Sequence, residues 1–225
     1  NTIVADTLRQ FADELEKASD FTGALHDLVA RTFREHGRIL FNGNNYSEEW
    51  AEEAERRGLL NLRTCADALP RFADKKNIEL FERMGVFTAR EVHSRMEIML
   101  ENYSKVLTIE GLTMIEMAKK DIYPAVNAYL SDLCAAAYRK AEMGAPVNAD
   151  KAAIARLSED NEGLYFAAEE EEKLLAAAKE AGDAEQTARF FADNVTPAMQ
   201  KLRAFADDME LNTAKKYWPF PTYGD

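Results

Sequence analysis

The feature that most constrains the fold is one helical pattern of unusual length, over residues 88–143. Thr88 and Glu91 have the spacing of a capping box, in which each side chain accepts a hydrogen bond from the other residue's backbone N–H. Apolar residues then recur every three or four positions, and a glycine and a proline follow the last turn. Few helices of globular domains are so long. We therefore expect this segment to be the spine against which other helices pack.

Two further helices are predicted after the spine, over 148–181 and 183–211, with Asp183 and Gln186 spaced as a second capping box. Both helices carry apolar residues at alternating spacings of three and four, which predicts an antiparallel, coiled-coil-like hairpin. The predicted seam positions are Ile154, Leu157, Asn161, Leu164, Ala168, Glu171, Leu175 and Ala178 in the first helix, and Ala188, Phe191, Val195, Ala198, Leu202, Phe205 and Met209 in the second.

Several residues predict departures from regular helices. Gly111 and Pro124 favour a kink or a break in the spine, and Pro197 favours a kink in the last helix. Asn161 either faces the seam and fixes the register of the hairpin or is turned outward at Gly163, and the sequence favours neither.

A run of four glutamates lies over 169–172 in the first helix of the hairpin. We predict that this run forms a solvated face of the helix. Glu171 weakens that prediction, because its spacing places it on the seam.

The first 87 residues predict shorter helices. An amphipathic helix covers 1–17, and Asp20 is placed to cap a second one. Any short strand should be limited to the neighbourhood of 38–41, and 42–45 (Asn-Gly-Asn-Asn) tolerates positive φ and should be an exposed turn. Three short helices follow, beginning after Ser47, Thr64 and Asp74 and ending at Gly58, Pro70 and Gly85.

These segments predict an all-α fold, a long-helix bundle with a helical hairpin and at most one short strand. We divide the chain into 1–87, with the short elements, and 88–225, with the spine and the hairpin, which can together form one continuous helical unit. Beyond the hairpin, the aromatic and proline residues of 217–223 predict an extended tail that docks on the bundle by its rings.

Composition supports this fold and argues against some classes of function. Alanine, glutamate and leucine are abundant, and glycine and proline are scarce. A net charge of −12 would repel the backbone of nucleic acids, so we expect no such partner. No apolar run approaches the length that spans a membrane and no signal peptide is visible, so we expect a cytoplasmic protein with no membrane partner.

Two cysteines and the first residue also bear on the kind of protein. Cys65 and Cys134 are isolated, and we interpret both as small buried apolar residues in a reducing compartment. The start at Asn1, without a methionine, indicates a fragment or a processed product.

The sequence contains no recognisable active site. Neither of the glycine-rich phosphate-binding motifs occurs. His26 and His36 lie ten residues apart on one predicted helix, so they cannot share a metal without other ligands. His93 and Glu97 are one helical turn apart and could face a metal, but no third ligand is identified, and we interpret His93 as a surface or hydrogen-bonded residue. We assign no catalytic, cofactor-binding or metal-binding residue.

Several segments, taken together and in order, resemble the C-terminal part of type III glutamine synthetases. They are NTIVA at 1–5, ILFNGNNYSEEW at 39–50, EAERRGL at 53–59, DALP at 67–70, GVFT at 85–88, HSR at 93–95, NY at 102–103, IEGLTM at 109–114, MAKKDI at 117–122, PAV at 124–126, PAM at 197–199 and WPFPTYG at 218–224. The resemblance covers essentially the whole chain, although over about 140–190 only helical character matches.

The resemblance implies an ATP-dependent enzyme of nitrogen assimilation that makes glutamine from glutamate and ammonia, with Mg²⁺ or Mn²⁺. The family's metal ligands and arginines lie on a sheet that precedes this chain, so none is carried onto a residue here. The chain would be structural and inactive alone, and its partners would be the N-terminal catalytic portion and other subunits of a ring-built homo-oligomer. The alternatives are a free-standing helical interaction module and, less favoured, an enzyme whose site lies in the bundle.

The loop that contains Tyr46 can also be compared with type I members of the wider family. Type I glutamine synthetases carry a regulatory tyrosine, modified by a nucleotidyl group, in a loop at a similar place. Tyr46 lies in such a loop, but its flanks do not match that site. We therefore interpret Tyr46 as a packing residue ahead of the Ser47 cap.

Overall fold

The computed structural model describes residues 1–221, and within this range the chain forms helices, turns and connecting segments without any strand. Two compact units are present, Asn1–Ile98 and Met99–Asp225. The all-α fold class is therefore confirmed. The boundary that the sequence places at 87/88 stays a prediction.

The first unit contains short helices. They are α1 (Thr2–Leu15), α2 (Phe21–His36), the 3₁₀ turn η1 (Gly37–Ile39), α3 (Glu48–Arg56), α4 (Cys65–Phe72) and α5 (Lys75–Arg83). The Asp20 carboxylate accepts a hydrogen bond from the N–H of Gly23 at 3.1 Å, as the cap of α2 requires. Gly58 and Gly85 take positive φ after α3 and α5, so the two glycine stops are confirmed.

The structure tests three local predictions in this unit. The run 38–41 overlaps the 3₁₀ turn η1 and forms no strand, which agrees with the prediction of at most one short strand. The turn at 42–45 is exposed, as predicted, although none of its residues takes the positive φ that its sequence tolerates; a Cβ on Gly43 would lie 2.6 Å from the Phe41 ring. The predicted helix end at Pro70 is wrong, because Pro70 lies inside α4, which continues to Phe72.

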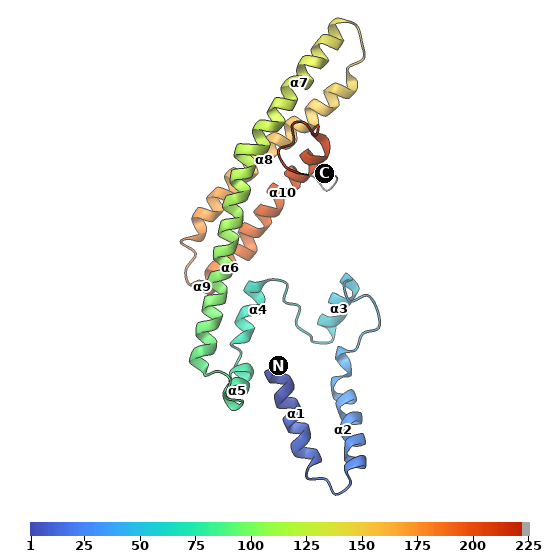
Figure 1. Cartoon of the computed structure of the whole chain (residues 1–225), viewed down its shortest axis with the longest axis vertical. Helices are drawn as coiled ribbons and strands as arrows, with labels where there is room; N and C mark the ends of the chain where they lie inside the picture. Colours follow the sequence, from blue (N-terminus) through green and yellow to red (C-terminus); the bar gives the residue numbers. More distant parts are fainter. Residues whose placement is uncertain (222–225) are drawn as a thin grey trace. The chain divides into compact units, whose positions relative to one another are not determined.

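The spine prediction is confirmed. Helix α6 (Ala89–Met117) continues through the π-helical turn η2 (Ala118–Ile122) into α7 (Tyr123–Glu142), and Figure 1 shows this run as one continuous rod. Thr88 N–H donates to the Glu91 carboxylate at 2.8 Å, and Glu91 N–H donates to the Thr88 hydroxyl at 3.3 Å, which completes the capping box. The helix passes Gly111 without a break.

Both prolines follow a π-helical turn. Pro124 comes after η2, and Pro197 comes after η3 (Phe191–Val195). Proline has no N–H for the carbonyl four residues earlier, and its ring crowds that carbonyl. Those carbonyls belong to Lys120 and Asp193, each inside its π turn, where the wider winding gives the ring room.

The second unit is built on the predicted hairpin. Helix α8 (Asn148–Ala178) packs against α7 on one side and against α10 (Thr196–Asn212) on another, and α9 (Ala184–Phe190) leads into η3. The predicted seam is confirmed, because every seam residue is buried except Ile154 and Phe205, which are half-buried.

The open question at the seam, whether Asn161 faces inward or outward, is decided by close contacts. Asn161 is 3% exposed and donates from Nδ2 to the Asn127 Oδ1 at 3.2 Å, so it faces inward. A Cβ on Gly163 would lie 2.4 Å from the Phe205 ring, so this glycine allows the two helices to approach instead of turning Asn161 outward.

The aromatic tail packs on the second unit as predicted, as far as the structure describes it. Trp218 and Phe220 contact the core cluster that includes Val126, Leu164 and Leu202. The ring of Tyr217 lies 5.1 Å from that of Tyr129. Thr222, Tyr223 and Gly224 lie outside the described residues.

The two cysteines and the apolar character of the helices were also subjects of prediction. Cys65 and Cys134 are both exposed, so their prediction as buried apolar residues is wrong; Ala66, 1% exposed, takes the core position beside Cys65. Over residues 1–221, no helix has both the length and the apolar character needed to cross a membrane.

Candidate functional site

The most distinctive surface of the first unit is an apolar groove between α1 and α2, which we call the α1–α2 groove. Its volume is about 420 Å³. It is lined by Leu8, Phe11, Ala12, Leu15, Leu25, Leu28, Val29, Thr32 and Phe33. Leu28, 3% exposed, forms the floor, whereas Leu8 and Phe33 on the rim are 60% and 63% exposed.

The sequence explains why this groove forms. Apolar residues of α1 and α2 recur at helical spacing, so each helix has one apolar face. Two helices side by side cover only part of those faces. The sole buried residue of α1 is Asp6, and Ile3 and Val4 extend the exposed apolar surface beyond the groove. An ion pair of 2.6 Å between Glu14 and Arg31 ties the helices together.

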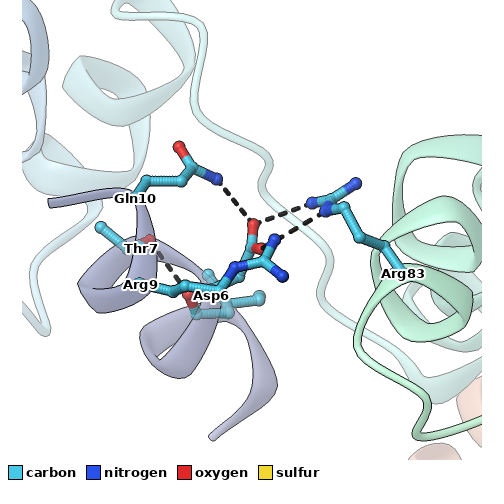
Figure 2. Close-up of polar contacts among 6 residues, drawn as sticks. Asp6, Thr7, Arg9, Gln10 and Arg83 are labelled. Atoms are coloured by element: carbon cyan, nitrogen blue, oxygen red, sulfur yellow. Dashed lines mark hydrogen bonds and ion pairs between the residues drawn. The ribbon is translucent and has the colours of Figure 1, made fainter. Parts of the chain in front are cut away.

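A polar cluster around Asp6 connects α1 to α5 (Figure 2). The Asp6 carboxylate, 5% exposed as a residue, accepts hydrogen bonds from Arg83 at 2.8 Å, Arg9 at 3.0 Å and Gln10 at 2.8 Å. The hydrogen bond from Arg83, aided by the charges of Arg83 and Arg9, holds the pKa of Asp6 below its ordinary value, against the opposing effect of burial. The cluster thus fixes the position of the α1 side of the groove.

The Asp6 cluster gives a pH prediction for the first unit. Because its pKa is lowered in the folded state, Asp6 stabilises the fold above its ordinary pKa of 3.8, and this contribution is lost as the pH falls through the folded pKa. We expect Asp6→Asn to lower stability at pH 7 and to weaken the dependence of stability on pH below about 4. Urea unfolding in a Trp218→Phe background, followed by the fluorescence of Trp50, measures both effects.

The control for Asp6→Asn is Asp13→Asn, a change of the same kind on an exposed position of α1. The control should leave both quantities unchanged. Equal acid sensitivity in the Asp6→Asn protein and the unchanged protein would contradict the role given to the cluster.

The histidines are placed apart and at the surface. His26 and His36 are exposed on α2, and His93 and Glu97 are exposed on α6. No group of three or more His, Cys, Asp or Glu side chains among residues 1–221 is arranged to hold a metal ion.

Tyr46 does not pack, which corrects the interpretation made from the sequence. Its side chain is 99% exposed. The loop around it is held instead by Asn44, whose side-chain oxygen accepts from the Tyr46 N–H at 3.0 Å and whose carbonyl accepts from the Ser47 hydroxyl at 2.8 Å. Ser47 stands at the N-cap of α3, but its side chain makes this loop contact and no cap hydrogen bond.

Sequence reasoning did not identify the groove. The amphipathic pattern of 1–17 was visible, and the spacing of Leu25, Leu28, Val29 and Phe33 in the next helix was visible too. Such a pattern predicts that a face is buried, but it does not say which surface covers it.

The family model and the known proteins that this chain matches all carry the same family name. The family model described as the glutamine synthetase C-terminal domain matches residues 24–141. A glutamine synthetase of Butyrivibrio fibrisolvens is 37% identical over 209 residues, which are 88% of this chain and 29% of that protein. A type-3 glutamine synthetase of Dictyostelium discoideum is 31% identical over 237 residues, 100% of this chain and 32% of that protein. A glutamine synthetase of Bacteroides fragilis (strain YCH46) is 24% identical over 233 residues, 99% of this chain and 32% of that protein.

Proposed function

This chain belongs to the glutamine synthetase C-terminal domain family, and from that premise we propose that it is the C-terminal helical part of an ATP-dependent glutamine synthetase. The complete enzyme would join glutamate and ammonia into glutamine in the cytoplasm, using ATP with Mg²⁺ or Mn²⁺. The role of this part would be structural: it covers the catalytic portion and shapes contacts between subunits.

The α1–α2 groove is the observation that supports the structural role. Exposed apolar side chains at Leu8, Val29 and Phe33 lie together on one face of two helices. Covering one such side chain completely is worth about 1.5–3 kcal/mol, so a continuous face of them favours association with another protein surface. The chain spans 29–32% of the length of the curated relatives it matches, and we propose that the remainder of the enzyme supplies that surface.

Electrostatics supports a structural role over a catalytic one. Phosphoryl transfer from ATP needs metal ions and cationic groups positioned on the phosphates. The net charge of −12 disfavours an anionic nucleotide, and lysines such as Lys119, Lys120 and Lys201 are paired with glutamates. We propose that the metal, ATP and glutamate sites lie in the catalytic portion.

We expect the 225-residue chain alone to fold but neither to bind Mg-ATP nor to form glutamine. Isothermal titration with Mg-ATP and a glutamine-forming assay test this expectation. Saturable nucleotide binding at micromolar concentration, or turnover that is lost on changing His93 or Glu97, would overturn the structural role and place a site in this chain.

The groove itself is tested in a complete glutamine synthetase that contains this chain. Leu8→Glu changes a 60% exposed side chain, so the isolated chain should unfold at the same urea concentration as before. In the complete enzyme the charge would be forced into an apolar contact, and assembly and activity should both fall. Asp13→Asn is the matched control on α1. A fully assembled and active Leu8→Glu enzyme would contradict the docking of the groove.

A further inference from the structure

Glu171 is a buried acid that the proposed function does not use. It lies on α8, on the seam of the hairpin, and is 0% exposed. Within residues 1–221, neither of its carboxyl oxygens has a hydrogen-bond partner. A buried charged group without a partner is costly, so its presence on the seam requires an explanation.

The carboxyl group lies against the backbone of α6 at Gly111. A Cβ on Gly111 would lie 2.7 Å from the Glu171 Oε1 and 3.1 Å from a methyl group of Leu175. The absence of a side chain at Gly111 therefore makes the space that the carboxyl group occupies. Leu175, which lies beside this space, belongs to an apolar core cluster with Ile115 and Val195.

Two lysines on neighbouring elements pair with other glutamates of the same run. Lys119 of η2 binds Glu169 at 2.6 Å and Glu172 at 2.7 Å, and Lys201 of α10 binds Glu170 at 2.6 Å. Glu171 is thus the member of the 169–172 run for which the structure records no ion pair, and its burial agrees with the seam position that its spacing predicts.

Three acids of α6 and η3 are exposed. On α6, Glu110 is exposed and Glu116 binds Lys120 at 2.7 Å, and on η3 Asp193 is exposed. Burial is the one cause that raises the pKa of Glu171, to about 7, and no charged side chain contributes.

We propose that Glu171 is a proton switch in the second unit: the protonated carboxyl group lets α8 close on α6 at Gly111, and its ionisation opens this contact. A neutral carboxyl group can remain in the apolar seam, whereas a carboxylate there must draw in water or leave the seam. Glu171 would thus control a conformational change within the second unit, and it plays no part in the α1–α2 groove.

The raised pKa of Glu171 determines how the stability of the second unit changes with pH. The folded state holds the proton more tightly than the unfolded state, in which the ordinary pKa of 4.5 applies. Stability from Glu171 is therefore fully present below pH 4.5 and is lost as the pH rises to about 7. Between pH 5 and pH 8 the unfolding equilibrium constant should rise about 70-fold from this one group.

Unfolding in urea at pH 5 and pH 8 tests the switch on the full chain. A Trp50→Phe background leaves Trp218, in the second unit, as the fluorescent reporter. Glu171→Gln should remove the 70-fold rise, and the matched control Glu170→Gln, on an exposed neighbour, should retain it. Asp160 also titrates in this unit, because burial and the adjacent Asp208 raise its pKa to about 6, and the comparison between the two variants cancels its contribution.

Two measurements on the unchanged protein test the switch without any variant. The ¹³C resonance of the Glu171 carboxyl group should titrate with a midpoint near 7, and backbone hydrogen exchange near Gly111 and Glu171 should quicken more between pH 6 and pH 8 than base catalysis alone explains. A midpoint near 4.5, or a Glu171→Gln protein with the pH dependence of the unchanged chain, would overturn the switch.

Discussion

Leu164→Asp should unfold the second unit at neutral pH. Leu164 is 0% exposed and belongs to the core cluster where α8 meets α10 and the spine. The change removes a buried apolar side chain and places a carboxylate in the same space, so we expect a loss of about 4 kcal/mol or more. A domain of this size has a total stability of about 5–15 kcal/mol, so such a loss removes much or all of it. Circular dichroism and urea unfolding measure the effect.

The matched control lies six residues further along the same helix. Glu170 is exposed and pairs with Lys201, so Glu170→Gln should change stability by no more than about 1 kcal/mol. Similar losses for the two variants would mean that the seam of α8 is not where the structure places it.

Phe191→Ala should cost the second unit about 3–5 kcal/mol. Phe191 is 3% exposed, begins the π turn η3 and packs in the cluster with Ile115, Leu175 and Val195. Removing its ring leaves a cavity at the point where the last helix is irregular, and the surrounding helices cannot close it fully. The measurement is urea unfolding followed by Trp218 fluorescence in the Trp50→Phe background.

Phe166→Ala is the control of the same chemistry. Phe166 is 60% exposed on α8, so its removal should change stability by about 0.5 kcal/mol or less. If both phenylalanine variants unfold at the same urea concentration, the η3 turn does not pack as described.

The sequence determined the helical organisation of this protein, because the features that encode it are local. Thr88 with Glu91 and Asp183 with Gln186 satisfy backbone groups within one turn, and the structure contains both capping boxes. The seam of the hairpin was readable for a related reason, since spacings of three and four mark one face of a helix.

Local sequence rules did not show which of two helix-weakening residues would interrupt the spine. Gly111 and Pro124 both weaken a helix, yet the irregular turn lies before Pro124, because a missing N–H and a crowded carbonyl act at a fixed distance of four residues. Gly111 leaves the hydrogen bonds intact and remains helical. Its role is read only from its neighbour across the interface, Glu171.

Only the tertiary structure decided what lies opposite each face. A helical repeat of apolar residues shows that a helix has an apolar side. The exposure of Leu8 and Phe33, however, depends on which other elements of the unit pack against them. The same limit explains the errors at Cys65 and Tyr46, whose residue types favour burial but whose places in the fold face solvent. Glu171 is the converse case: its charge favours solvent, and the packing of α8 against α6 encloses it. Burial depends on residues distant in sequence, and no local pattern contains that information.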